Sequence, residues 1–186
     1  MSPVLENPAI RSRAHLLSVK EYHALGELGF LSKRTELIEG VVIEKMPKSP
    51  RHATLVLKIL KALTLIIPKN MHVRSEQPIT LEQSEPEPDI SIVKGSISDY
   101  ENSHPTQAEL VVEVSLTTLS EDRSMAFVYA QANIPEYWLF NLNNNTVEVY
   151  AKPMQDRYSE MKTYSNTDIL TLTSLPEIKL ELSSIF

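Results

Sequence analysis

Apolar positions along the chain recur at helical spacing in three segments. Ser18 and Glu21 match a capping box, and apolar residues follow at every third or fourth position, which predicts a helix over residues 19–28. A second helix is expected over residues 52–67 and a third over residues 120–131. The second segment is apolar nearly all round, as in a helix that is deeply buried or lies at a subunit contact. Periodicity places Ala53, Val56, Leu60, Leu63 and Ile67 on one face of this helix.

Between these helices, short runs of β-branched and aromatic residues predict strands. Two runs within residues 35–46 flank Glu39-Gly40, which predicts a hairpin because glycine tolerates the positive φ of a tight turn. Residues 110–114 are almost continuously apolar, as in a central strand. Further strands are expected at 73–76, 78–81, 89–93, 137–140 and 147–150. Because strands and helices alternate, the predicted fold class is α/β, or α+β, with a mixed sheet.

The length of the chain predicts a single domain. Its 186 residues fall within the range of about 100–200 residues that one domain usually spans. Residues 1–17 are expected to form an irregular N-terminal arm and residues 18–150 the core. Residues 151–186 are expected to add C-terminal strands and loops.

Composition excludes several classes of function. The chain has no cysteine, which excludes disulfide scaffolds, thiolate metal sites and cysteine nucleophiles. A net charge of −6 argues against broad electrostatic binding of nucleic acid but leaves room for a local basic groove. The longest apolar run, residues 63–67, is too short to span a bilayer, and the N-terminus lacks a secretory pattern. We therefore expect a cytoplasmic protein with no membrane partner.

Several common catalytic motifs are missing from the sequence. The 4 glycines form neither a dinucleotide-binding fingerprint nor a P-loop, and no serine lies in a nucleophile elbow. The 5 histidines do not occur at metal-ligand spacing. What remains is a pair of carboxylates.

Asp89 and Glu113 are unusual because each lies in or beside a strand that is otherwise apolar. Asp89 follows Pro88 at the start of one predicted strand, and Glu113 is the only charged residue between Leu110 and Leu116. A lone carboxylate in a buried strand is costly unless it is paired or binds a cation. Glu113 could meet Arg123 in an internal ion pair, or the two acids could hold a metal. The residues alone leave both interpretations open.

Five segments occur along the chain in a distinctive order and spacing. They are Glu36-Leu37-Ile38-Glu39-Gly40, Ser49-Pro50-Arg51-His52, Pro88-Asp89-Ile90-Ser91-Ile92-Val93, Leu110-Val111-Val112-Glu113-Val114-Ser115 and Ile134-Pro135-Glu136-Tyr137-Trp138-Leu139. Together they resemble the Uma-type restriction-endonuclease family of the PD-(D/E)XK nuclease superfamily. The resemblance runs from about Ser18 to about Tyr150.

This resemblance implies a restriction-endonuclease-like core, with a mixed central sheet flanked by helices, and a metal-dependent endonuclease that cleaves DNA. It implies that Asp89 and Glu113 bind Mg²⁺ or Mn²⁺ and that Glu36 completes the acidic cluster. Glu39 is a neighbouring candidate, although its turn position favours a solvated side chain. It also places His52 near the site, where a catalytic and a structural role are equally consistent with the pattern.

The chemistry of these residues fits such a site. Hard carboxylate oxygens suit Mg²⁺, which retains several waters and needs few protein ligands. Clustered acids repel one another unless a cation lies between them. A metal held there would lower the pKa of a bound water, and a nearby lysine would stabilise the charge of the transition state.

The helix that should supply this lysine departs from the family pattern, which resembles Asp-Arg-x-x-Lys-x-x-x-Tyr. Here it is Asp122-Arg123-Ser124-Met125-Ala126-Phe127-Val128-Tyr129, one residue shorter and without lysine. The protein could be a catalytically degenerate member, or Arg123 could replace the lysine, although a guanidinium cannot act as a base. Alternatively, a residue such as a modified lysine is missing between Met125 and Ala126.

Two functions therefore stay open at the level of sequence. The first is a metal-dependent DNA endonuclease with Asp89, Glu113, Glu36, His52 and Arg123 as candidate site residues. The second is a nuclease-fold protein that binds nucleic acid or a protein without cleaving it. The apolar helix over residues 52–67 is consistent with a homodimer or with simple burial beneath the sheet.

Overall fold

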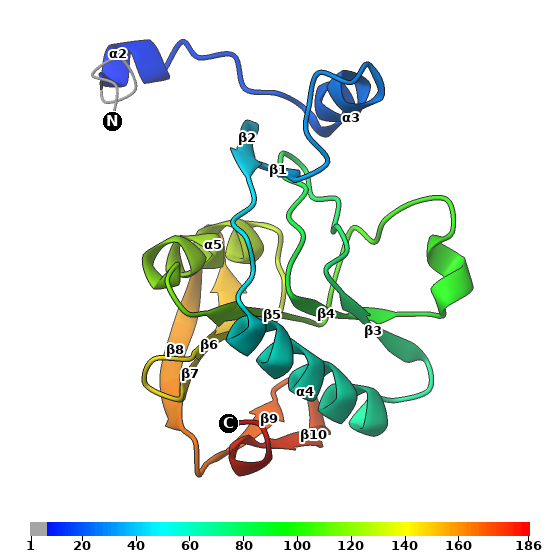
Figure 1. The fold of residues 1–186 in the computed structure, drawn as a ribbon, viewed down its shortest axis with the longest axis vertical. Coiled ribbons are helices and arrows are strands. Elements are labelled where there is room, and N and C mark those ends of the chain that lie inside the picture. Colours follow the sequence, from blue (N-terminus) through cyan, green and yellow to red (C-terminus); the bar gives the residue numbers. More distant parts are fainter. Residues whose placement is uncertain (1–6) are drawn as a thin grey trace.

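The computed structural model describes residues 7–186, and its centre is a six-stranded sheet (Figure 1). In order across the sheet, the strands are β3 (Met71–Ser75), β4 (Ile90–Lys94), β5 (Leu110–Ser115), β6 (Glu136–Asn141), β7 (Thr146–Met154) and β8 (Arg157–Ser165). β5 and β6 pair in parallel, and the other neighbours pair antiparallel. This confirms the mixed α/β class.

Each face of the sheet packs against a different helix, α4 (Pro50–Ile66) or α5 (Leu119–Gln131). Alternate residues of β5 serve the two faces, since Val112 and Val114 join the core beneath α4 whereas Val111 joins the core beneath α5. Glu113 therefore lies on the α5 face. The hairpin of β9 (Ile169–Leu172) and β10 (Leu175–Glu181) closes the core on the α4 side.

Helix α4 begins earlier than predicted, and its buried face coincides only in part with the expected apolar face. Ser49 caps it by accepting a hydrogen bond from the His52 amide at 3.2 Å. Its buried residues are Leu55, Val56, Ile59 and Leu63. Of the face expected from periodicity, Val56 and Leu63 are buried, Leu60 and Ile67 are partly buried and pack against the same core, and Ala53 is exposed. A helix that is apolar nearly all round does not specify its inner face by periodicity alone.

α4 also bears on the predicted dimer. It lies against the sheet of its own chain, and Leu57 and Leu65 are 64% and 76% exposed. The homodimer stays a prediction.

In the part of the chain that the structure describes, no helix has the length and apolar character needed to cross a membrane.

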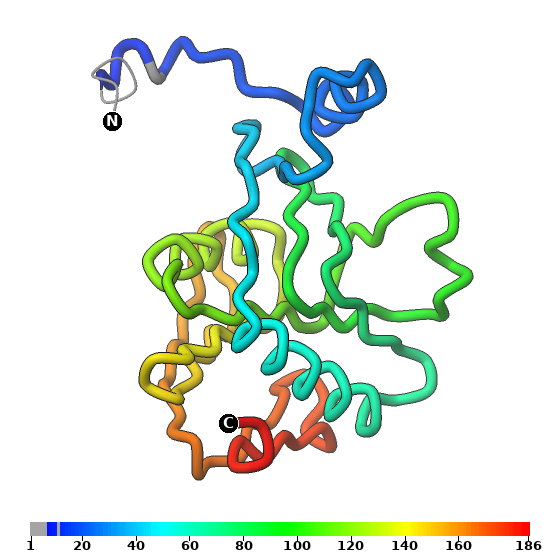
Figure 2. The backbone as a smooth tube through the Cα atoms, viewed as in Figure 1, coloured from blue at the N-terminus to red at the C-terminus, as the bar shows by residue number. Residues whose placement is uncertain are grey.

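The N-terminal segment leads away from the sheet (Figure 2). It contains one helical turn, α2 (Pro8–Arg11), where an irregular arm was predicted; residues 1–6 of that arm lie outside the described residues. The predicted capping box of α3 (Val19–Glu27) is confirmed. Strands β1 (Thr35–Ile38) and β2 (Val41–Glu44) form the predicted hairpin, with φ of 48° at Glu39 and 75° at Gly40.

Two strand predictions need correction. Residues 78–81 form a loop, not a strand, although Ile79 is fully buried. Their amides donate isolated hydrogen bonds to loop carbonyls, as when Thr80 donates to Pro105 O at 2.9 Å, and form no strand ladder. Apolar character alone therefore does not place these residues in a sheet. β7 extends beyond Tyr150 to Met154, and β8 then joins the central sheet. Short 3-10 turns, η1 (Ile97–Tyr100) and η2 (Leu182–Ser184), complete the fold.

Candidate active site

Asp89 and Glu113 lie opposite each other on neighbouring strands. Asp89 directly precedes β4, and the antiparallel register that pairs Ile90 with Val112 places it across from Glu113 of β5. The Asp89 amide donates to Oε2 of Glu113 at 3.1 Å, and the Val114 amide donates to Oδ2 of Asp89 at 2.8 Å. Main-chain hydrogen bonds thus fix both carboxylates.

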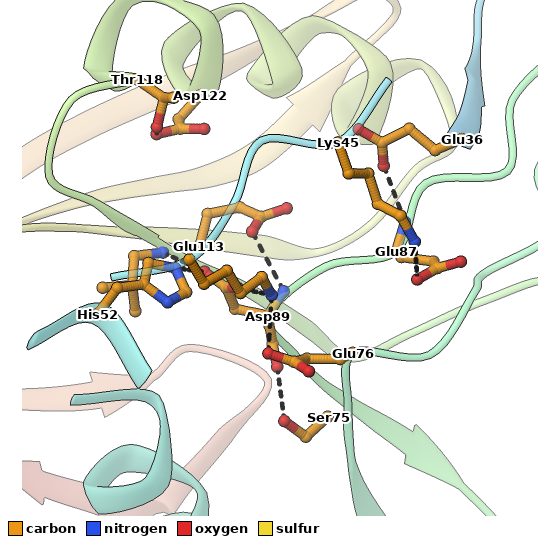
Figure 3. A network of polar contacts seen from close by, with 12 residues as sticks. Glu36, Lys45, His52, Ser75, Glu76, Glu87, Asp89, Glu113, Thr118 and Asp122 are labelled. Atoms are coloured by element: carbon orange, nitrogen blue, oxygen red, sulfur yellow. Dashed lines mark hydrogen bonds and ion pairs between the residues drawn. The ribbon is translucent and has the colours of Figure 1, made fainter. Parts of the chain in front are cut away.

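The Asp89 carboxylate is buried and contacts two nitrogen groups (Figure 3). Lys48 Nζ lies 2.7 Å from Oδ1, and His52 Nε2 lies 2.9 Å from Oδ2. Burial alone would raise the pKa of Asp89, but the hydrogen bond from His52 and the charge of Lys48 outweigh it and lower the pKa below its ordinary value. Asp89 is therefore held as an anion.

Glu113 has the opposite electrostatic environment. Burial and the neighbouring charges of Asp89 and Asp122 hold the pKa of Glu113 well above its ordinary value. The Tyr129 hydroxyl of α5 donates to its Oε1 at 3.0 Å. Because the charged form of Glu113 is disfavoured beside Asp89, a cation between the two would favour both carboxylates.

Glu36 lies in the same cleft but in a separate group, together with Lys45 and Glu87 (Figure 3). Its Oε2 accepts a hydrogen bond from the Glu87 amide at 3.1 Å, and Lys45 forms an ion pair with the Glu87 side chain. Burial raises the pKa of Glu36. Among the described residues, no three histidine or acidic side chains are close enough to hold a metal ion between them. Glu36 does not join Asp89 and Glu113 in such a group.

The cleft that contains both groups has a volume of about 600 Å³. Its charged and histidine lining is Arg34, Glu36, Glu44, Lys45, Lys48, His52, Glu76, Glu87, Asp89, Glu113, Glu121 and Asp122. Mg²⁺ is commonly held by one or two carboxylates and completes its shell with water and substrate phosphate oxygens. The paired oxygens of Asp89 and Glu113 fit this requirement.

Arg123 and Glu39 lie outside this arrangement. The Arg123 guanidinium binds Glu148 of β7, with Nε 3.0 Å from Oε2, so the pair with Glu113 considered from sequence does not form. Arg123 is not among the residues that line the cleft. Glu39 is exposed in the β1–β2 turn, where its amide donates to Ser84 Oγ at 2.9 Å.

The family described as "Uma2: Putative restriction endonuclease" matches residues 19–183 of this sequence. The chain belongs to the Uma2 family. Its fold is similar to the crystal structure of a "putative nuclease belonging to DUF820" from Anabaena variabilis, with a TM-score of 0.67 and 20% identity, covering 87% of this chain and 96% of that one. No curated protein matches the sequence.

Membership of Uma2 confirms the resemblance found from the sequence, but the sequence analysis overlooked Lys48. The family pattern predicts a lysine on α5, but α5 runs without interruption through Met125, and Met125 lines the cleft. Lys48 instead comes from the segment between β2 and α4. Its position directly before the Ser49–His52 motif was the one available signal.

Proposed function

We propose that this member of the Uma2 family hydrolyses phosphodiester bonds of DNA with the help of Mg²⁺ or Mn²⁺ bound by Asp89 and Glu113. The observation that supports the proposal is the position of these two carboxylates side by side in the lining of the cleft, each accepting a hydrogen bond from a main-chain amide. A salt bridge to a structural arginine would have explained a buried Glu113 without any catalytic role, but Arg123 is bound elsewhere.

In this reaction a water oxygen forms a new bond to phosphorus while the bond from phosphorus to one sugar oxygen breaks. The leaving oxygen takes a proton from solvent, and the attacking water releases one. Asp89 and Glu113 would hold the Mg²⁺, which would stabilise negative charge on the phosphate and make a water more acidic. His52 orients the Asp89 carboxylate, and Tyr129 orients that of Glu113. Glu36, across the cleft, is available for a substrate-bound water or a second cation.

A catalytically degenerate binding protein is the second candidate. It is favoured by α5, which lacks the lysine expected for the family between Met125 and Ala126 and contributes Met125 to the lining of the cleft. A protein of this kind would bind DNA in a salt-sensitive manner without cutting it.

The test measures nicking of supercoiled plasmid and cleavage of end-labelled single- and double-stranded DNA with Mg²⁺ or Mn²⁺. We expect cleavage that is lost in Asp89→Asn and Glu113→Gln. Asp99→Asn serves as the control, because Asp99 only caps the Ser96 amide at an exposed turn. Binding without cleavage under every metal condition would favour the second candidate.

A further inference from the structure

Lys48 is fixed at the entrance to the carboxylate pair by its position in the chain. It lies between Pro47, which restricts φ, and Ser49, whose side chain caps α4. The side chain is 36% exposed, so its ammonium group reaches Asp89 while one side still faces the open cleft. This is the arrangement expected of a group that meets a substrate.

Two carboxylates hold the ammonium group from different directions. Lys48 Nζ lies 2.7 Å from Oδ1 of Asp89 and 2.8 Å from Oε1 of Glu76. The side chain of Glu76 is 51% exposed, so its charge does not need a partner for the sake of burial. Glu76 therefore has the geometry of a positioning residue for Lys48.

The backbone of Glu76 supports this interpretation. Its φ is 53°, a left-handed conformation that residues other than glycine seldom adopt. The Glu76 amide is held by the carbonyl oxygens of Pro88 and Asp89, each at 3.2 Å. This backbone conformation directs the Glu76 side chain toward Lys48, and a left-handed residue beside a cleft is a candidate for a functional role.

Lys45, the other lysine of this segment, is placed differently. It forms its ion pair with Glu87, beside Glu36 and apart from Asp89 (Figure 3). Among the described residues, Lys48 is the lysine in ion-pair contact with Asp89, and none is in such contact with Glu113.

We propose that Lys48 is a catalytic residue, which donates a hydrogen bond to a non-bridging oxygen of the phosphate that is cleaved. The proposal rests on the proposed function. An ammonium group has three N–H donors, so Lys48 can keep its bond to Glu76 while another donor turns from Asp89 to the phosphate. It stabilises the added negative charge of the transition state and takes no proton from the water. The lysine is thus supplied by the segment before α4 and not by α5.

The absence of cysteine from the sequence allows a direct test. In Lys48→Cys, alkylation with 2-bromoethylamine places an aminoethyl-cysteine, close to lysine in length and charge, at that position alone. We expect Lys48→Cys to cleave DNA about 100-fold more slowly than the wild type, and alkylation to restore most of the rate. Mn²⁺ affinity, measured by calorimetry, should be unchanged or tighter, because the ammonium no longer competes for Asp89. Lys94→Cys, at an exposed ion pair with Glu109, is the control and should cleave normally before and after alkylation.

Each contrary outcome has a definite meaning. Wild-type protein that cleaves no DNA overturns both the proposed function and this inference. Cleavage by the wild type and by unalkylated Lys48→Cys at equal rates overturns the inference alone. The same holds if alkylation fails to restore the rate although circular dichroism shows native folding, or if Lys48→Cys loses Mn²⁺ affinity together with cleavage. Loss of cleavage in Lys45→Cys, with full activity in Lys48→Cys, would assign the role to the other lysine.

Discussion

The main-chain amide of Asp89 donates a hydrogen bond to the side chain of Glu113, and the two carboxylates therefore share one local framework. The Val114 amide completes it by donating to Asp89. Replacing either acid by its amide removes the charge with little change in side-chain size, and it turns one acceptor oxygen into a donor.

Glu113→Gln should stabilise the metal-free protein at pH 8. The pKa of Glu113 is held well above its ordinary value, so the charged side chain opposes folding, whereas glutamine has no charge to bury. We expect a gain of about 1 kcal/mol in the free energy of unfolding. Mn²⁺ should raise the melting temperature of the wild type but not of the variant. Glu160→Gln, which changes an exposed ion pair, should leave both quantities as in the wild type. A Mn²⁺-induced shift of equal size in Glu113→Gln would contradict the assignment of Glu113 as a ligand.

Glu76→Gly should make the protein more stable and less active. Glycine relieves the positive φ of Glu76, which we expect to raise the free energy of unfolding by about 1 kcal/mol. The variant also removes one of the two carboxylates that hold Lys48, so the cleavage rate should fall. Asn145→Gly is the matched control, since Asn145 has a φ of 52° in a turn outside the cleft that contains Asp89 and Glu113. Asn145→Gly should gain stability with no loss of activity. An equal loss of cleavage rate in both variants would argue against a role for Glu76.

Arg123→Met should lower stability without reducing cleavage. It leaves the buried carboxylate of Glu148 with only the Tyr150 hydroxyl as donor, which we expect to cost about 1–2 kcal/mol. The hydrogen bond from Arg123 lowers the pKa of Glu148 below its ordinary value of 4.5. The stabilisation that Arg123 provides is therefore present at pH values above 4.5 and is lost as the pH falls through the lowered pKa of Glu148. The difference in unfolding free energy between wild type and variant should therefore shrink at acidic pH. A folded variant without activity would instead give Arg123 the catalytic role considered from sequence.

Gly40→Ala should destabilise the β1–β2 hairpin. Gly40 has a φ of 75°, and a Cβ there would lie 2.6 Å from the Cβ of Leu16 and 3.0 Å from the carbonyl oxygen of Leu17. We expect a loss of about 1–3 kcal/mol, measured by urea denaturation. Gly26→Ala, in α3 with nothing within 4 Å of the new methyl group, should instead stabilise by about 0.5–1 kcal/mol. Equal effects of the two substitutions would exclude the steric explanation.

Features that depend on neighbouring residues could be predicted from the sequence. The capping box of Ser18 and Glu21 and the Glu39-Gly40 turn are set by local hydrogen bonds and by φ, and both are present. Asp89 and Glu113 could be recognised because a charge in an apolar strand stands out. Their exact pairing needed the register between β4 and β5, which the hydrophobic pattern alone does not specify.

Features that depend on the path of a loop could not be predicted. Lys48 meets Asp89 from a segment without regular structure, and its position before the Ser49–His52 motif does not by itself show that it, and not Lys45, reaches Asp89. Arg123 was a plausible partner for Glu113 by type of charge, yet the turn of α5 directs it to Glu148. The choice among several lysines, or several acids, is made by tertiary packing.

The register of β4 against β5 has a further consequence for when the two carboxylates come together during folding. Because side chains alternate between the two faces of a strand, a slip of one residue would turn Glu113 toward the α4 side, away from Asp89. Partly folded chains that have not yet paired these strands therefore lack the carboxylate pair altogether. Under the proposed function, the capacity to bind divalent ions should therefore appear during refolding only with the completed sheet.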